Sequence, residues 1–179
     1  MAITPPSERI WWKEPVHKVE IIWVIIAFLW GVAMFFTMIW WHGFGQVNMS
    51  NEAYRVQPFQ FAEKVDAMVA THTVRQEGAF PVVKPPPGSD VYMMGRVYMW
   101  WPMLELEKGQ TYRLHLSSID LQHGFSLQPL NINIQVHPGY ESVMTITPTS
   151  SGEFGIVCNE YCGLGHHTMT GRIYVVERT

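Results

Sequence analysis

An uninterrupted apolar segment near the N-terminus constrains this chain more than any other feature. Residues 21–41 read IIWVIIAFLWGVAMFFTMIWW and contain no charged side chain. At about 1.5 Å per residue, a helix of this length spans roughly 30 Å, the thickness of the hydrocarbon core of a bilayer. Trp23, Trp40 and Trp41 lie near its ends, where interfacial aromatic residues are enriched. The segment therefore predicts one transmembrane helix over residues 20–42.

Two other interpretations of this segment are weaker. A buried core helix is seldom so long and so free of charge. A cleaved signal peptide has a shorter apolar region followed by a cleavage site with small residues. The sequence WHGFGQVN that follows Trp41 contains no convincing site of that kind. The pattern favours a membrane anchor over both alternatives.

Basic residues predict the orientation of the anchor. Arg9, Lys13 and Lys18 precede the apolar segment, whereas the first Lys or Arg after it is Arg55. Because Lys and Arg accumulate on the cytoplasmic side, residues 1–19 are expected in the cytoplasm. The remaining chain is then expected on the periplasmic or outer face of a bacterial or archaeal membrane. The net charge of −3 offers no basic patch, which argues against a nucleic-acid partner.

The segment between the anchor and residue 90 carries mixed signals. Phe61, Val65 and Met68 have helical spacing, which predicts a short amphipathic helix or an irregular linker. The proline-rich stretch VVKPPPGSD reads as a loop. We therefore assign residues 43–90 to a linker.

The C-terminal half changes to the alternating pattern of β-strands. From Val91 onward, short runs rich in β-branched and aromatic residues are separated by Lys108-Gly109, Pro138-Gly139 and Ser151-Gly152 turns. Six or more such strands in about 90 residues indicate a β-sandwich or small barrel. The predicted fold is mainly β, with a domain over residues 91–179 that could begin near residue 72.

Both cysteines of the chain fall in one short stretch, CNEYCGLGHHTM, at residues 158–169. A disulfide is the simplest interpretation outside the cytoplasm, and two Cys with two His also suit a zinc site. Neither explains Met169, because a thioether is a poor zinc ligand but suits copper. One Cys, two His and an axial Met would make a one-copper electron-transfer site. A second Cys allows two copper ions to share both sulfurs.

A second histidine ligand must come from elsewhere in the sequence. His123 follows an Asp-containing turn in SSIDLQHGFSL and is expected at the start of a strand. His115 alternates with leucines inside a predicted strand and is expected to face solvent. The remaining histidines are weaker candidates because they lie beside a turn or in the linker: His42, His72 and His137.

These residues carry a resemblance to a known family. The pattern D-x-x-H followed by C-x-E-x-C-x3-H-x2-M resembles the CuA centre of cytochrome c oxidase subunit II. The matching positions are Asp120, His123, Cys158, Glu160, Cys162, His166 and Met169. The resemblance implies a cupredoxin Greek key behind a membrane anchor. It also implies bridging thiolates from both cysteines, terminal imidazoles from both histidines, a weak thioether ligand and the backbone carbonyl of Glu160. His167 does not fit the spacing and is left outside the ligands.

The resemblance extends along most of the chain. A single helix, together with TVRQEG at 73–78, HGF at 123–125 and NINIQVHPG at 131–139, is similar to the B-type branch of haem–copper oxidases. That branch can carry Gln where this chain has Glu160. In the A-type branch the corresponding carboxylate helps to bind magnesium, so a magnesium site at Glu160 is a further implication.

The resemblance implies an electron relay rather than a catalyst on its own. The chain would accept electrons from cytochrome c or a similar soluble carrier and pass them to haem in subunit I, where oxygen is reduced to water. The alternatives are the CuA subunit of a nitric oxide reductase and a membrane-tethered copper chaperone. Nitrous oxide reductase has a far longer chain, and quinol oxidase subunit II lacks the copper ligands.

Two further roles follow from the resemblance. In the family an exposed aromatic residue over the copper centre receives electrons, and YMWWP offers Trp100, then Trp101, with Tyr98 beside them, although the W-x-W pattern of the family is absent. The plainer interpretation of these rings is hydrophobic core. Period two places Tyr98 and Trp100 on one face and Trp101 on the other. Glu20 is either an interfacial carboxylate favoured by the N-terminal end of the helix dipole or the point where protons enter subunit I.

Overall fold

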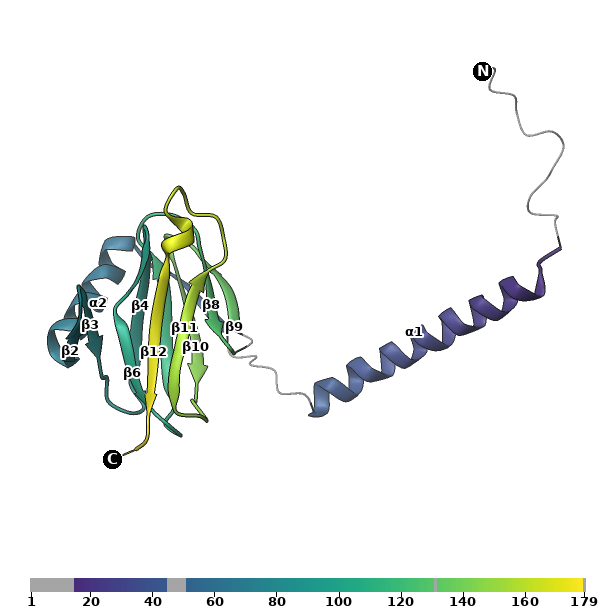
Figure 1. The fold of residues 1–179 in the computed structure, drawn as a ribbon, viewed down its shortest axis with the longest axis horizontal. Coiled ribbons are helices and arrows are strands. Elements are labelled where there is room, and N and C mark those ends of the chain that lie inside the picture. The colour runs from purple at the N-terminus through teal and green to yellow at the C-terminus, as the bar shows by residue number, and fades with distance from the viewer. Residues whose placement is uncertain (1–14, 45–50, 131, 179) are drawn as a thin grey trace, which may run out of the picture. The chain divides into compact units, whose positions relative to one another are not determined.

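The computed structural model describes residues 15–44, 51–130 and 132–178. The chain divides into two compact units at residues 47 and 48. The first unit contains helix α1, and the second contains the β-strands and helix α2 (Figure 1). The two units are described separately below.

Helix α1, Lys18–Phe44, coincides with the apolar segment and slightly exceeds the predicted limits. It has 27 residues, and its most apolar stretch of 18 residues has a mean hydropathy of 2.4, so its length and composition are sufficient to cross a membrane. Among the described residues it is the one helix with these properties. At its start, the backbone N–H of His17 donates to Glu20 Oε2 at 2.9 Å.

The second unit is built from two β-sheets that enclose one apolar core (Figure 1). The five-stranded sheet has the order β1 (Asn51–Arg55), β10 (Tyr140–Ile146), β7 (Tyr112–Ser118), β4 (Asp90–Arg96) and β5 (Met99–Trp101). The seven-stranded sheet has the order β2 (Thr73–Glu77), β3 (Phe80–Val83), β6 (Met103–Glu107), β12 (Thr170–Val176), β11 (Gly152–Cys158), β8 (His123–Gln128) and β9 (Ile132–Val136).

Alternation along the strands explains how the core forms. In β7, Tyr112, Leu114 and Leu116 are almost fully buried. Because successive side chains of a strand point to opposite faces, these alternate residues share the face that lies on the core. Trp100 and Phe125 fill the core near His123 and stack edge to face at 5.2 Å. The predicted mainly β fold behind one N-terminal helix is confirmed.

Helix α2, Pro58–His72, confirms the helical alternative for the segment after the anchor. Phe61, Val65 and Met68 are its buried residues, as their spacing requires. Phe61 and Val65 form a small cluster with Met94 of β4. The helix therefore covers the outer face of the five-stranded sheet.

The structure differs from the predicted linker over residues 43–90. Strand β1 pairs with β10, and β3 pairs in parallel with β6, so residues 51–90 belong to the β-unit. The sequence could not reveal this because each of these strands is short and its partner is distant in the chain.

The strand register brings the candidate ligand residues predicted from the sequence to one end of the unit. Strands β8 and β11 are antiparallel, and Cys158 at the end of β11 pairs with Phe125 near the start of β8. His123 begins β8, as predicted. The loop after Cys158 contains the short helix η2, His166–Thr168, and leads directly into β12. His123 and the cysteine loop therefore meet although 35 residues separate His123 from Cys158.

Candidate metal centre

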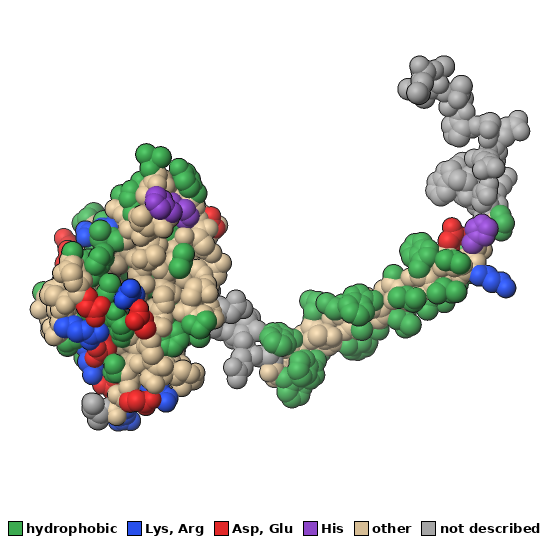
Figure 2. Space-filling model, viewed as in Figure 1, with side chains coloured by type: hydrophobic (Ala, Val, Ile, Leu, Met, Phe, Trp, Pro, Cys, Tyr) green, Lys and Arg blue, Asp and Glu red, His purple; other side chains and the backbone are tan. Residues whose placement is uncertain are grey.

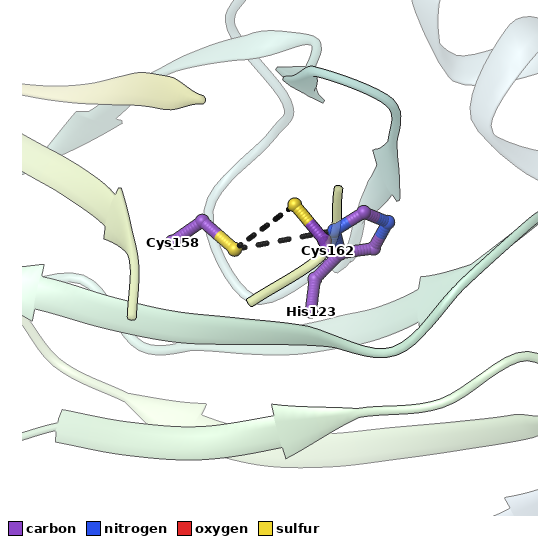
Figure 3. A group of neighbouring side chains, drawn as sticks. All are labelled: His123, Cys158 and Cys162. Atoms are coloured by element: carbon purple, nitrogen blue, oxygen red, sulfur yellow. Dashed lines mark hydrogen bonds between the residues drawn. The ribbon is translucent and has the colours of Figure 1, made fainter. Parts of the chain in front are cut away.

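Three buried side chains form the centre of the site. His123, Cys158 and Cys162 bring one potential ligand atom each to within 4.8 Å of one another (Figure 3). The two Sγ atoms lie 3.8 Å apart, and Cys158 Sγ lies 4.0 Å from His123 Nδ1. Both cysteines are free, so the arrangement differs from the disulfide interpretation.

Three more donors surround this centre, and all six predicted ligands come together. Cys162 Sγ lies 3.6 Å from His166 Nδ1 and 3.7 Å from Met169 Sδ. On the other side, Cys158 Sγ lies 3.2 Å from the carbonyl oxygen of Glu160. Each sulfur therefore has one imidazole and one weak donor beside it. The two sulfurs face each other in the middle of the site.

The donor set suits copper. Soft thiolate and thioether ligands with imidazoles favour copper, and Met169 is almost fully buried beside the sulfurs rather than on the surface. Burial, followed by the hydrogen bond and charge of Cys158, raises the pKa of the Cys162 thiol to about 11. The thiol of the metal-free protein is therefore protonated at neutral pH, and metal binding must displace that proton.

Backbone contacts fix the ligand loop. The N–H of Cys158 donates to the carbonyl oxygen of Met169 at 3.1 Å, and the N–H of Met169 donates to the backbone carbonyl oxygen of His166 at 3.1 Å. Gln135 of β9 donates through Nε2 to Glu160 Oε1 at 3.0 Å. The side-chain carboxylate of Glu160 is thus held by β9, while the backbone carbonyl of the same residue faces Cys158 Sγ.

Gly124 allows the ligand loop to approach β8, and its replacement gives a clear test. A Cβ at this position would lie 2.0 Å from Asn159 Oδ1 and 2.8 Å from the backbone N of Glu160. Gly124→Ala should therefore push residues 159 and 160 outward and weaken copper binding, on the order of the 10–100-fold loss seen when outer partners of a metal site are removed. Copper titration of the purified chain measures this effect. Gly155→Ala, where a Cβ meets nothing within 4 Å, is the matched control. Equal copper affinity in both variants would contradict the expected displacement.

The aromatic residues near the site differ in part from the prediction. Trp100 is fully buried, so the expectation that it is an exposed aromatic is wrong. It packs against His123, with ring centroids 6.0 Å apart, and against Gly171 of β12, which holds it inside the core. Its indole Nε1 has no hydrogen-bond partner among the described residues.

Tyr98 and Trp101 are both half-buried, and they face different surroundings. The Tyr98 ring lies on the ligand loop so closely that a Cβ on Gly165 would come within 2.4 Å of it. Trp101 instead packs against Phe80 and under the guanidinium of Arg96. The split of these side chains between two faces therefore follows the period of two.

Other histidines lie outside the site. His115 was expected to face solvent, and this is wrong: it is buried, with Nδ1 against the carboxylate of Glu141. Glu141 belongs to β10, which pairs with β7, so the partner that permits burial comes from a different part of the sequence. His167 is part of the ligand loop, in η2, and its side chain is exposed.

Sequence reasoning missed two exposed residues of the ligand loop. Tyr161 is 77% exposed and its ring lies 5.8 Å from that of His166, and Leu164 is 90% exposed. Figure 2 shows hydrophobic and histidine side chains gathered at this end of the unit, with acidic and basic side chains further down the same face. The available signal was the position of Tyr161 between the two cysteines and that of Leu164 two residues before His166.

Comparison with known proteins shows which family the chain belongs to. No family model matches the chain. A cytochrome c oxidase subunit 2 from Thermus thermophilus is 39% identical over 112 residues, which cover 59% of this chain and 83% of the relative. The chain belongs to the cytochrome c oxidase subunit 2 family. This family forms part of an oxidoreductase complex, as predicted.

A solved structure agrees with this membership at the level of the fold. A chain from the cryo-EM structure of a haem–copper terminal oxidase dimer aligns with a TM-score of 0.57 and 19% identity, covering 89% of this chain and all of the other. A nitrous-oxide reductase from Cupriavidus necator is 27% identical over 144 residues, but the match covers 72% of this chain and only 22% of the reductase. The subunit II resemblance inferred from the sequence is therefore confirmed.

Proposed function

We propose that this chain is the electron-accepting subunit of a B-type haem–copper terminal oxidase. Its binuclear CuA centre takes electrons from cytochrome c or a similar carrier and passes them to haem in subunit I, where oxygen is reduced to water. The ligands are His123, Cys158, the Glu160 carbonyl, Cys162, His166 and Met169. Bound copper supplies a one-electron site delocalised over two ions.

The pairing of donors around the two sulfurs carries this proposal. Cys158 has His123 and the Glu160 carbonyl beside it, and Cys162 has His166 and Met169. A one-copper site of one Cys, two His and Met169 would leave the second buried thiol and the Glu160 carbonyl unused. Two sets of donors, each with one sulfur, one imidazole and one weak donor, fit a centre of two copper ions instead.

The protein keeps the site rigid and closed. His123, Cys158, Cys162 and Met169 are buried and are attached to the paired strands β8, β11 and β12 or to the loop between them. Rigid ligands limit rearrangement when an electron is gained or lost, and six protein donors leave no position for a substrate. Both properties favour electron transfer over catalysis at this site.

Helix α1 is proposed to anchor the β-unit at the outer face of the membrane. The helix is long and apolar enough to span a bilayer. Lys18 lies at its start, and Arg9 and Lys13 precede it, whereas Arg55 is the first Lys or Arg beyond its end. The positive-inside rule then places the N-terminus in the cytoplasm.

Electron paramagnetic resonance of the copper-loaded full-length chain tests the proposal. A mixed-valence signal delocalised over two copper ions is expected. A single-copper signal or a silent product would reject the binuclear centre and favour the chaperone alternative. Turnover of the complex with oxygen and with nitric oxide distinguishes the oxidase from a nitric oxide reductase. Magnesium binding at the Glu160 carboxylate stays a prediction.

Tyr98 is the aromatic residue that best fits electron acceptance, because Trp100 is buried and Trp101 faces Phe80. Its ring covers Gly163 and Gly165 of the ligand loop. Tyr98→Ala should slow electron uptake from reduced cytochrome c about tenfold, the lower end of the range seen among mutants of one interface. Stopped-flow kinetics measure the rate, with Trp101→Ala as the control. Slower uptake only in the Trp101 variant would assign the role to Trp101.

Glu20 is proposed as the residue that admits protons for oxygen reduction. Its carboxylate accepts a backbone N–H from His17 at 2.9 Å, which also satisfies the simpler role of capping the helix start. Glu20→Gln should leave the copper spectrum unchanged and slow turnover and proton uptake by the assembled complex. Lys18→Gln, which alters a neighbouring charge at the same helix start, is the control. Parent-like turnover of Glu20→Gln across the working pH range would reduce Glu20 to a structural role.

A further inference from the structure

Asp120 makes an unusual number of contacts for a residue outside the ligand set. Its Oδ1 lies 2.8 Å from His123 Nε2 and accepts from the backbone N–H of Leu121 at 2.6 Å. Its Oδ2 accepts from the backbone N–H of Val97 at 2.7 Å. Burial raises its pKa, but the hydrogen bonds from His123, Val97 and Leu121 outweigh burial and hold the pKa below its usual value. The carboxylate thus accepts a backbone N–H at each of its two oxygens.

One oxygen of Asp120 determines how His123 is presented. Nε2 of the ring faces the carboxylate, while Nδ1 faces Cys158 Sγ at 4.0 Å. Both oxygens of Asp120 already accept backbone N–H groups, so the carboxylate acts as an acceptor and Nε2 donates its hydrogen to it, which leaves the lone pair of Nδ1 on the sulfur side. The contact thus fixes both the tautomer and the orientation of the ring.

The other oxygen holds a different part of the fold. Val97 lies between β4 and β5 and directly precedes Tyr98. The end of β4, just before this turn, approaches His123 so closely that a Cβ on Gly95 would lie 2.9 Å from His123 Cδ2. Ile119, next to Asp120, also donates its N–H to the carbonyl of Gly95 at 3.2 Å. Asp120 is the side chain that joins this turn to the metal-site histidine.

We propose that Asp120 is a positioning residue that sets two distances with one carboxylate. It holds His123 Nδ1 toward the copper, and it holds the turn that carries Tyr98 over the ligand loop. The electron-accepting contact and the copper ligand are thereby fixed as one unit. This inference rests on the proposed function for the copper and the electron, but the two hydrogen bonds can be tested without metal.

Three variants of the full-length chain separate these effects. Asp120→Ala removes both hydrogen bonds. In Asp120→Asn only one oxygen remains, so the side chain can accept from His123 or from Val97 but not from both. Glu153→Gln neutralises an exposed carboxylate, paired with Arg172 at 3.1 Å, at the opposite end of β11 and serves as the matched control.

The first measurements use the metal-free protein. Hydrogen exchange at the Val97 amide should become faster in Asp120→Ala and stay unchanged in Glu153→Gln. Nitrogen chemical shifts of the His123 ring should show the Nε2–H tautomer in the parent and a mixture in Asp120→Ala. Parent-like exchange and a parent-like tautomer in Asp120→Ala would overturn the proposal. If Asp120→Ala does not fold, the same comparison with Asp120→Asn decides, because one of the two signals must change.

The second measurements use the copper-loaded protein. Copper affinity of Asp120→Ala should fall about 10–100-fold, as is typical for loss of an outer partner of a ligand histidine. The reduction potential should rise, since the carboxylate no longer makes the imidazole a stronger donor to the oxidised centre. An unchanged affinity and potential, with a binuclear signal in the parent, would contradict the role of Asp120. A parent without that signal would instead reject the proposed function, and the metal-free measurements would still judge Asp120.

Discussion

Cys158→Ser is expected to abolish the binuclear copper signal. Cys158 Sγ lies between His123 Nδ1 at 4.0 Å and the Glu160 carbonyl at 3.2 Å, and it faces Cys162 Sγ at 3.8 Å. A serine hydroxyl is a harder donor than a thiolate and cannot replace it as a bridge for copper. The half of the site that contains His123 would then lack its sulfur. Electron paramagnetic resonance should show a single-copper or silent product.

Cys158→Ser should lower copper affinity strongly, whereas Met169→Leu should not destroy the centre. Copper affinity should fall by more than the roughly 10–100-fold typical of outer-shell changes, because a direct ligand is lost. Met169→Leu removes a weak ligand of similar volume, so the binuclear signal should persist with an altered reduction potential. If Cys158→Ser and Met169→Leu both kept the spectrum of the parent, the assignment of the ligands would be wrong.

The clustering of the predicted ligands illustrates what local spacing can indicate. Cys158 ends β11, and Cys162, His166 and Met169 follow on the loop before β12, so their order in the sequence already restricts their geometry. His123 was predicted at the start of a strand after an Asp-containing turn, and it begins β8. The membrane helix could be predicted for a similar reason, since length and composition alone define it.

Features that depend on distant partners could not be predicted. The side chain of His115 is buried because Glu141 faces it from β10, and no local pattern in β7 reveals that contact. The strands in residues 51–90 were missed because β1 and β3 find their partners, β10 and β6, much later in the chain. For Trp100, alternation gave the face of the strand correctly but not what covers that face.

Trp100→Ala is expected to cause a large loss of stability. Trp100 is fully buried and packs against Phe125 and His123, and Gly171 lies against its Cβ. Truncating a buried Trp leaves a cavity and typically costs about 3–5 kcal/mol in the free energy of unfolding. Removal of Nε1–H, which has no partner among the described residues, offsets part of this loss, because an unsatisfied buried N–H costs about 1–3 kcal/mol. The metal-free chain should therefore unfold at a clearly lower temperature than the parent.

Circular dichroism during heating measures this change, and Trp101→Ala is the matched control. Trp101 is half-buried against Phe80 and Arg96, so its removal should cost much less than that of Trp100. Because the Trp100 ring lies against His123, Trp100→Ala should also perturb the copper spectrum, whereas Trp101→Ala should not. A Trp100 variant that is as stable as the parent but slow to accept electrons would contradict a purely structural role. It would return Trp100 to the position of electron acceptor, through a path that does not require an exposed ring.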